Sequence, residues 1–346
     1  MEKKYNVIIN NSDLKFSGNC KDTTILDEAL NSNIPLPHSC KSGACGSCIT
    51  KLVKGSILLR NKKLIKKQEN VFLCQSFGNS KDIVLEYSSK KLKIILDQSK
   101  NNFINIPKEY LLQVVANRAI TPLVNQLSFF LPSKLNFKFL PGSHMEILSE
   151  GVKLKRKYSI MNSPKNLSLR DNILSFLIIR HEKTGFSNFI HKNIKPGDIM
   201  SLNGPFNSFY YSINNEPVIG IAGGTGISPI LSIILDLLIK NKNADILFFL
   251  FFRNREEILE MDTMYKLKEK YKNFNFKISL TREMNLSNSQ FLIGRVDKTL
   301  EKVFKDLSTH KILISGSDGF VDTSYNHVLK LKGKKENIYF EKYSVN

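Results

Sequence analysis

The sequence predicts a multidomain chain of α+β and α/β class, because the spacing of its apolar residues changes twice along its 346 residues. The first part reads as short alternating strands around one helix. The middle part has short apolar runs broken by Pro, Gly, Ser and Asn, which is typical of a small barrel or sandwich. The last part alternates apolar strands with longer helical stretches, which is typical of a doubly wound parallel sheet. A chain of this length is also too long for a single hydrophobic core.

Composition limits the class of protein. The hydrophobic content of 42% and the charged content of 24% are ordinary for a soluble globular protein. Five cysteines are too few for a disulfide scaffold, and the odd number favours a reducing compartment, hence the cytoplasm. Residues 1–10 show no secretory signal. The apolar stretch 217–239 contains Asp236, Pro229 and a Gly-Gly-Thr-Gly break, so we expect strand, loop and helix there and no membrane span.

The net charge of +20 would suit an acidic protein partner, nucleic acid or an anionic membrane. Basic residues are spread along the chain, without an arginine-rich arm or a recognised nucleic-acid motif, so no nucleic-acid partner is expected. A general bias toward Lys, Asn and Ile explains the charge better. Where the charge is functional, it predicts a protein partner with an acidic docking face.

Three of the five cysteines lie in the stretch HSCKSGACGSC, residues 38–48. Their spacing, Cys-x4-Cys-x2-Cys with a fourth cysteine after 25 further residues, is the plant-type [2Fe–2S] spacing. Four thiolates are required because each iron is tetrahedral and takes two cysteine sulfurs besides the bridging sulfides. The Gly, Ala and Ser residues between the cysteines let the backbone wrap closely around a cluster. The expected cluster ligands are Cys40, Cys45, Cys48 and Cys74.

Zinc binding and disulfide formation are two other possible uses of these cysteines. A zinc site normally has paired Cys-x2–4-Cys knuckles, whereas Cys74 stands alone in sequence. Disulfides are disfavoured by the odd number and by the expected compartment. The alternative from another class is a basic zinc-binding interaction protein without redox turnover.

The segments around the cysteines support an iron–sulfur domain. KYNVIIN and LKFSG, joined by a polar turn, predict a hairpin, TTILDEALNSN predicts a short helix with a Thr cap, and DIVLEY predicts a returning strand. This order describes a β-grasp ferredoxin domain over residues 1–93. The segment TILDEALNSNIPLPHSCKSGACGSC resembles the cluster segment of the ferredoxin family. The polar, Lys- and Asn-rich residues 94–108 are expected to be a linker.

The middle domain, residues 109–213, contains the run RKYSI. On a strand Arg156 and Tyr158 share one face, and a guanidinium beside a flat phenol suits a flavin with its phosphate. Ser159 could donate to the reacting nitrogen edge of the flavin. Further on, Gly185 begins GFSNF at an expected helix start, where exposed N–H groups can hold a pyrophosphate.

In this order and spacing, the two motifs resemble the flavin domain of the ferredoxin–NAD(P)H reductase superfamily, an antiparallel β-barrel that binds FAD. The resemblance implies that Arg156, Tyr158 and Ser159 hold the isoalloxazine and ribityl side. It also implies that the phosphates are held by Gly185, Phe186 and Ser187.

The last domain, residues 214–346, is expected to be the NAD(P)H-binding α/β domain. PVIGIAGG reads as a buried strand, and the turn of Gly223, Gly224, Thr225 and Gly226 lets a pyrophosphate approach a helix N-terminus. Ser228 is a candidate N-cap, and Pro229 fits the first helical position. A tight strand–helix turn without a ligand explains this segment as well. GGTGISP nevertheless matches the nicotinamide-nucleotide segment of the superfamily, Gly-Gly-x-Gly-x-[Ser/Ala]-Pro.

Three positions bear on how this domain works. Ser315 and Gly316 stand where the superfamily often has Cys-Gly near the nicotinamide ring, which predicts slower hydride transfer. Arg253 stands where a glycine is usual, which puts the adenosine pocket in doubt. The pair Thr281-Arg282 favours NADPH, whereas the most similar family uses NADH, and we expect NADH.

Together the three modules predict an electron-transfer enzyme. NAD(P)H gives a hydride to FAD, and electrons pass singly to the [2Fe–2S] cluster and then to a protein partner. Ser159 and Ser315 are the expected catalytic residues. RKYSIMNSP, LIIRHEKTGFSNFI and LNGPFNSFYY resemble the CDP-6-deoxy-delta-3,4-glucoseen reductase type, and this resemblance weakens after residue 330. It implies a dehydratase partner in deoxysugar synthesis. The alternative is the reductase component of an aromatic-ring or alkane oxygenase.

Overall fold

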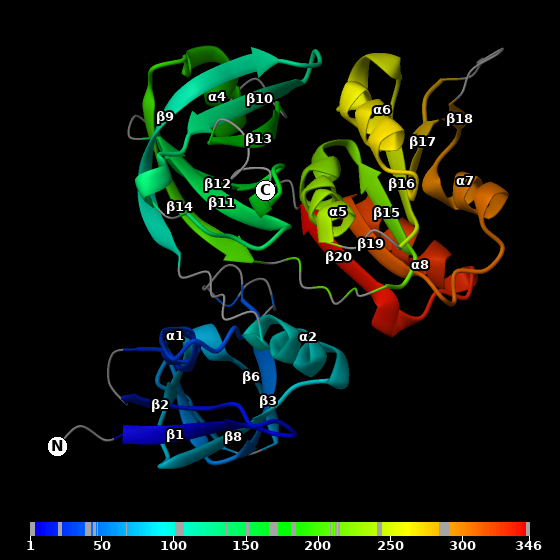
Figure 1. Cartoon of the computed structure of the whole chain (residues 1–346). Helices are drawn as coiled ribbons and strands as arrows, with labels where there is room; N and C mark the ends of the chain where they lie inside the picture. The colour runs from blue at the N-terminus through cyan, green and yellow to red at the C-terminus, as the bar shows by residue number, and fades with distance from the viewer. Residues whose placement is uncertain are drawn as a thin grey trace. The chain divides into compact units, whose positions relative to one another are not determined.

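The structure is a computed structural model of the 346-residue chain. It describes residues 4–19, 23–38, 43, 46, 48–66, 68–100, 107–135, 137–149, 152–165, 172–180, 185–207, 209, 211, 213, 215–240, 244–283 and 291–343. The contacts divide the chain into two compact units (Figure 1). The first unit is Met1–Pro107 with Pro205–Ser212, and the second unit is Lys108–Gly204 with Ile213–Asn346.

The first unit is a β-grasp fold. Its larger sheet has the order β2-β1-β8-β3-β6, in which β1 and β8 are parallel and the other pairs are antiparallel. A small sheet, β5-β4-β7, lies beside it. The elements are β1 (Lys4–Ile9), β2 (Lys15–Asn19), α1 (Ile25–Asn31), β3 (Ile49–Lys54), β4 (Ser56–Leu59), β5 (Leu64–Lys66), β6 (Glu69–Phe72), η1 (Leu73–Gln75), β7 (Ser76–Gly78), β8 (Asp82–Glu86) and α2 (Ser89–Lys100).

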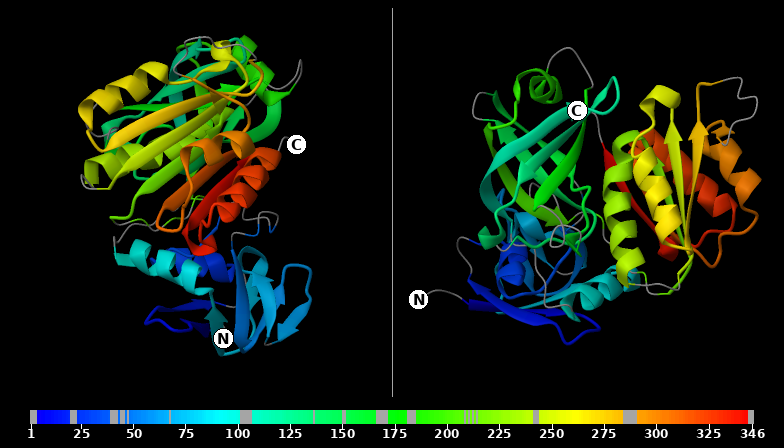
Figure 2. Two further views of the ribbon diagram at one scale, coloured as in Figure 1. Left: turned by 90° about the vertical axis from the view of Figure 1, so that its right-hand side faces the viewer. Right: turned by 45° about the horizontal axis from the view of Figure 1, so that its top comes forward.

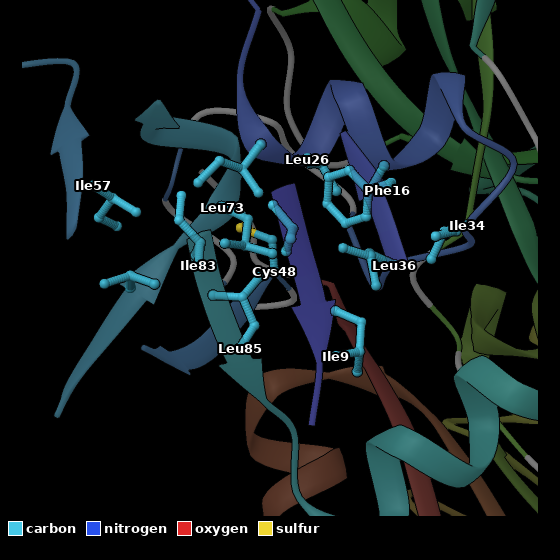
Figure 3. Close-up of a cluster of buried hydrophobic side chains, with 14 of the residues drawn as sticks. Ile9, Phe16, Leu26, Ile34, Leu36, Cys48, Ile57, Leu73, Ile83 and Leu85 are labelled. Atoms are coloured by element: carbon cyan, nitrogen blue, oxygen red, sulfur yellow. The ribbon is translucent and has the colours of Figure 1, made fainter. Parts of the chain in front are cut away.

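Period-two alternation builds the core of this unit. Strand β1 buries Tyr5, Val7 and Ile9 and exposes the residues between them, and helix α1 covers these side chains with Leu26 and its neighbours. The helix begins as expected, because the Thr24 side chain accepts a hydrogen bond from the Asp27 N–H at 3.2 Å. Figure 3 shows Cys48 among these apolar side chains.

The barrel of the second unit has six strands in the order β12-β11-β14-β9-β10-β13. Its two outer strands approach each other, since Met161 N–H, just after β12, donates to Ser175 O on β13 at 3.1 Å. This contact closes the sheet into a barrel. The elements are β9 (Lys108–Ala119), β10 (Val124–Phe130), β11 (Ser143–Ser149), β12 (Val152–Ser159), β13 (Ile173–Ile179), α4 (Phe186–Asn193) and β14 (Ile199–Asn207).

The rest of the second unit is a parallel sheet with the order β18-β17-β16-β15-β19-β20. Helices lie on both faces of this sheet (Figure 2). Gly220 of β15 faces Ile230 of α5, and the side chain of Ile219 belongs to a core shared with α7 and α8. The elements are β15 (Val218–Gly223), η3 (Gly224–Gly226), α5 (Ile227–Lys240), β16 (Ile246–Phe252), α6 (Met261–Lys270), β17 (Phe274–Leu280), β18 (Leu292–Ile293), α7 (Val296–Val303), β19 (Lys311–Ser317), α8 (Asp318–Lys330) and β20 (Ile338–Tyr343).

The expected fold class is confirmed in all three parts. The apolar stretch 217–239 is the strand, turn and helix that the sequence predicts. Within the described ranges, no helix combines the length and apolar character that crossing a membrane requires. Helix α2 occupies part of the passage expected as a linker, and the domain boundaries drawn from the sequence stay a prediction.

One local expectation is wrong. Ser228 is not an N-cap, because the 3₁₀ turn η3 runs directly into α5, which begins at Ile227. Gly224, the first residue of η3, has a positive φ of 55°, which glycine adopts readily and which lets the chain turn from β15 into η3. Pro229 is then the third helical residue, still in the first turn, where a missing N–H costs nothing.

Candidate functional site

Strand pairing brings two of the expected cluster ligands together in the first unit. Cys48 directly precedes β3, and Cys74 lies in η1 after β6. These strands are antiparallel, with Ile49 opposite Phe72, and the two Sγ atoms lie 3.3 Å apart. Residues 26 positions apart in sequence thus become neighbours. Cys40 and Cys45 lie outside the described residues.

The described residues fit half of a [2Fe–2S] site. Tetrahedral metal–thiolate bonds of about 2.3 Å place two sulfurs on one ion roughly 3.8 Å apart, close to the observed separation. Both side chains are only 3% exposed, which keeps water away from the sulfurs. Gly43 and Gly46 have φ of 85° and 71°, so the loop turns in a left-handed conformation that glycine adopts readily.

The expected flavin-binding strand is β12. Arg156 is exposed and Tyr158 is half-buried, and both project from the same side of the strand. Burial raises the pKa of the Tyr158 phenol, and the charge of Arg156 opposes this shift only in part. Tyr158 is therefore a neutral hydrogen-bond donor beside a fixed cation, which suits an isoalloxazine with its phosphate.

The expected phosphate segment lies at the N-terminus of α4, and this helix contacts β12. Gly185 is the N-cap with φ 97°, and the space where a Cβ would lie is open. Phe186, at 2% exposure, anchors the first turn in the barrel core, while Ser187 is half-buried. The backbone N–H groups of this first turn are thus presented next to β12, where they can donate hydrogen bonds to a phosphate.

The expected nucleotide turn lies at the switch point of the parallel sheet. The chain leaves β15 toward β16 on one side and later returns to β19 on the other. In open parallel sheets, the carboxyl ends of strands at such a switch point are where a ligand crevice is expected. Gly223–Gly226 follows β15, and Ser315-Gly316 ends β19. A Cβ on Gly226 would lie 2.3 Å from the carbonyl oxygen of Ser315, so only glycine lets the two segments meet. This arrangement fits a dinucleotide approaching both segments.

Four side chains from the barrel and the sheet converge at one corner of the second unit. Ser159 Oγ, at the end of β12, lies 2.9 Å from the hydroxyl of Tyr343 and 3.3 Å from Oε2 of Glu341. Tyr343 donates to the same carboxylate at 3.4 Å. Ser315 is fully buried and pairs with Glu341 in the β19–β20 register. The two expected catalytic serines thus share one neighbour, Glu341.

Burial controls the electrostatics of this corner. Burial raises the pKa of Tyr343 well above its usual value, the negative charge of Glu341 raises it further, and the hydrogen bond from Ser159 opposes both effects. Tyr343 therefore stays a neutral phenol at physiological pH. Its hydroxyl can hydrogen-bond to both Ser159 and the Glu341 carboxylate.

Glu341 and Tyr343 were missed by sequence reasoning. They lie on β20, in the region where the family resemblance weakens. A signal was present: Glu-x-Tyr on a strand places both side chains on one face, and charged and phenolic side chains on one strand face near a predicted ligand crevice are candidates for binding.

Arginines mark the expected adenosine end of the crevice, after β16 and β17. The Arg282 N–H donates to the carbonyl oxygen of Arg253 at 2.9 Å, which places the two residues side by side. Arg255 is held instead by Glu283, through contacts of 2.8 Å from its backbone N–H and 3.3 Å from its Nε. Arg253 Nη1 in turn lies 3.9 Å from Oε1 of Glu257, so carboxylates accompany the arginines where the two strands end.

Three known family models match successive parts of the chain. Residues 7–77 match the 2Fe-2S iron-sulfur cluster binding domain, residues 111–211 match the oxidoreductase FAD-binding domain, and residues 221–325 match the oxidoreductase NAD-binding domain. Strand β20, with Glu341 and Tyr343, lies beyond the last matched residue. The expected cofactors, a [2Fe–2S] cluster, FAD and NAD(P)H, are confirmed at the level of these domains.

Relatives of two kinds resemble this chain. Terephthalate 1,2-dioxygenase, reductase component 1, of Comamonas sp is 29% identical over 325 residues, which cover 92% of this chain and 91% of the relative. CDP-6-deoxy-L-threo-D-glycero-4-hexulose-3-dehydrase reductase of Yersinia pestis is 31% identical over 227 residues, which cover 65% of this chain and 64% of the relative.

A solved structure shares the fold over almost the whole length. The Amycolatopsis cytochrome P450 reductase GcoB has a TM-score of 0.75 at 17% identity, covering 98% of both chains. The zinc-binding interaction protein finds no support, since the matched domains are those of redox enzymes. The chain is therefore an oxidoreductase that combines [2Fe–2S], FAD-binding and NAD-binding domains.

Proposed function

We propose that this oxidoreductase passes electrons from NAD(P)H through FAD and a [2Fe–2S] cluster to a separate partner enzyme. The observation that carries the proposal is the corner where Ser159 of the barrel meets Glu341 and Tyr343 of the parallel sheet. It joins the end of the expected flavin strand to the crevice expected to hold the nicotinamide. FAD, when bound, supplies the conversion of a two-electron hydride into single electrons.

We assign roles to this chain's residues as follows. Arg156 and Tyr158 bind the flavin side, and the α4 N-terminus at Gly185, Phe186 and Ser187 binds the phosphates. The turn of Gly223, Gly224, Thr225 and Gly226, with Gly316, admits the nucleotide backbone to the crevice. Ser159 and Ser315 are the catalytic residues, and Glu341 and Tyr343 orient Ser159. Cys40, Cys45, Cys48 and Cys74 are the cluster ligands, and Cys48 and Cys74 share one iron because their sulfurs are neighbours.

The partner is expected to dock through an acidic face on the basic turn between β4 and β5. This turn exposes Arg60, Lys62 and Lys63 and has no acidic residue. The Arg60 N–H donates to the carbonyl oxygen of Gln75 at 2.9 Å, so the turn lies next to the segment of the cluster ligand Cys74. Cations beside the electron exit would steer an acidic surface toward it.

A charge-reversal test examines this face. Lys62→Glu should slow electron delivery to the partner and flatten its salt dependence. Lys81→Glu, an exposed change before β8 that alters the net charge in the same direction, should have a smaller effect. Equal effects of both charge changes would show that the overall charge, and not this turn, sets the rate.

Two classes of acceptor have support. The dehydrase reductase of Yersinia pestis favours a dehydratase that holds a sugar adduct, in line with the motifs around Arg156 and Gly185. The dioxygenase reductase of Comamonas sp matches over nearly the whole chain and favours an oxygenase. Either acceptor enzyme, together with the small number of cysteines, is consistent with a cytoplasmic location for this chain.

The two acceptors are separated by coupled turnover. The purified protein is mixed with NADH and either a dehydratase carrying its sugar adduct or an oxygenase component with its aromatic substrate, and product is measured against NADH consumed. We expect near-stoichiometric product with the dehydratase. Product formed only with the oxygenase would identify the protein as the reductase component of an oxygenase instead. NADH consumption without product in either mixture would contradict both.

A further inference from the structure

One amide side chain lies next to the expected cluster ligand Cys74. Gln75 directly follows Cys74 in η1, and its Nε2 lies 3.7 Å from the Cys74 Sγ and 2.9 Å from the Cys74 carbonyl oxygen. We propose that the Gln75 amide donates a hydrogen bond to this sulfur and thereby raises the reduction potential of the cluster. The inference rests on the proposed function, because it requires a cluster bound to Cys74.

The orientation of the amide follows from its neighbours. A carbonyl oxygen only accepts hydrogen bonds, so the amide nitrogen, and not the amide oxygen, must face the Cys74 carbonyl. The same nitrogen carries a second hydrogen, and the sulfur lies within its reach. Rotating the amide by 180° would bring two oxygens together and is unfavourable.

The backbone and the cluster loop hold Gln75 in this position. Its carbonyl oxygen accepts from the Arg60 N–H at 2.9 Å, and the Ser76 hydroxyl, one residue on, donates to Phe72 O at 2.8 Å. From the other side Gly43 leaves room for the side chain: a Cβ there would lie 3.1 Å from the Gln75 Cγ. The glutamine side chain therefore lies against Gly43.

The direction of the effect follows from charge. A cysteine sulfur bound to the cluster is negatively charged, and the negative charge on the sulfurs increases when one electron is added. A donor aimed at the sulfur therefore stabilises the reduced state more than the oxidised state. Cys74 is 3% exposed, so water screens this interaction weakly.

The test compares midpoint potentials of purified, cluster-loaded protein. Gln75→Met keeps the length of the side chain and removes the donor, and Gln75→Glu replaces the donor with a negative charge. We expect the midpoint potential of Gln75→Met to be about 59 mV lower, which is a tenfold change in the equilibrium constant for one-electron reduction. The decrease in Gln75→Glu should be larger. Gln113→Met, the same substitution at an exposed site of β9 in the second unit, should leave the potential unchanged.

A measurement on the wild-type protein tests the same contact if the Gln75 variants do not retain the cluster. Protein labelled with ¹⁵N in the glutamine side-chain amide should show a ¹⁵N hyperfine coupling to the reduced cluster in pulsed electron spin resonance. An unchanged potential in an iron-replete Gln75→Met variant, or no such coupling in the wild type, overturns the role of Gln75. Wild-type protein without iron would instead refute the proposed function itself.

Discussion

The cluster site of the first unit and the serine–tyrosine corner of the second unit are built in opposite ways. The expected cluster ligands lie between residues 40 and 74, three of them within nine residues. The corner assembles Ser159, Ser315, Glu341 and Tyr343, of which Ser159 and Tyr343 are 184 positions apart. A site made by a local loop can be recognised from spacing, whereas a site made by tertiary packing appears only when the elements are in place.

The two sites also differ in how they should respond to mutation. At the cluster each ligand is required, because each tetrahedral iron takes two cysteine sulfurs. At the corner the hydroxyls and the carboxylate orient one another, so loss of one weakens the arrangement without removing a cofactor. The predictions below test this contrast, from the largest expected effect to the smallest.

The largest effect is expected for Cys74→Ser. Electron delivery to one-electron acceptors that need the cluster should fall by roughly a hundredfold or more, because one iron loses a thiolate. Reduction of bound FAD by NADH, followed by stopped-flow absorbance, should persist, since the flavin and nucleotide segments lie in the second unit. Loss of flavin reduction in a folded Cys74→Ser protein would mean that the two sites are not separable.

Next in size is Arg156→Ala. Removing a charge-assisted contact to the flavin should weaken FAD affinity by about 10- to 100-fold, measured as bound FAD per chain after dilution. Lys157→Ala is the matched control, because the neighbouring residue on the same strand points to the opposite side. If both variants lose FAD equally, the general charge of β12 and not Arg156 holds the flavin.

A smaller effect is expected for Tyr343→Phe, which removes the contacts to Ser159 and Glu341. Hydride transfer should slow by about three- to tenfold, as for loss of a neutral hydrogen bond. No change in the rate would show that the corner has no part in hydride transfer.

Tyr343 also predicts a dependence of stability on pH. Its pKa is raised in the folded protein, so its contribution to stability is complete below pH 10, the usual tyrosine value, and is lost as the pH rises further. The difference in unfolding free energy between wild type and Tyr343→Phe should therefore be constant up to about pH 10. Above that pH the wild type should lose stability relative to Tyr343→Phe. Urea titrations at several pH values measure this difference, and a shift already present near pH 8 would contradict the raised pKa.

The smallest effect is expected for Arg282→Ala, which tests the nucleotide preference. We expect a kcat/KM ratio of NADPH to NADH below one in the wild type, and a further decrease of about three- to tenfold in the variant. Arg295→Ala, an exposed arginine before α7, should leave the ratio unchanged. A wild-type ratio above one would overturn the expected preference for NADH.

The sequence alone predicted the three-part fold because each part has its own periodicity: alternation in β1, short broken runs in the barrel, and apolar strands such as β15 between helices. It also pointed to Ser159 and Ser315 through short motifs. It could not predict that β20 returns beside β19 and carries Glu341 and Tyr343 to Ser159, because that contact depends on how the barrel meets the sheet. The N-cap error at Ser228 has a similar cause, since the 3₁₀ winding of η3 is set by packing of Gly226 against Ser315.

The most direct test of the account is an anaerobic titration of the purified protein with NADH, followed by electron spin resonance and iron analysis. Two iron atoms per chain and a reduced-cluster signal that grows with added NADH would agree with electron flow from the second unit to the first. Iron-free protein, or bleaching of FAD without any cluster signal, would contradict it.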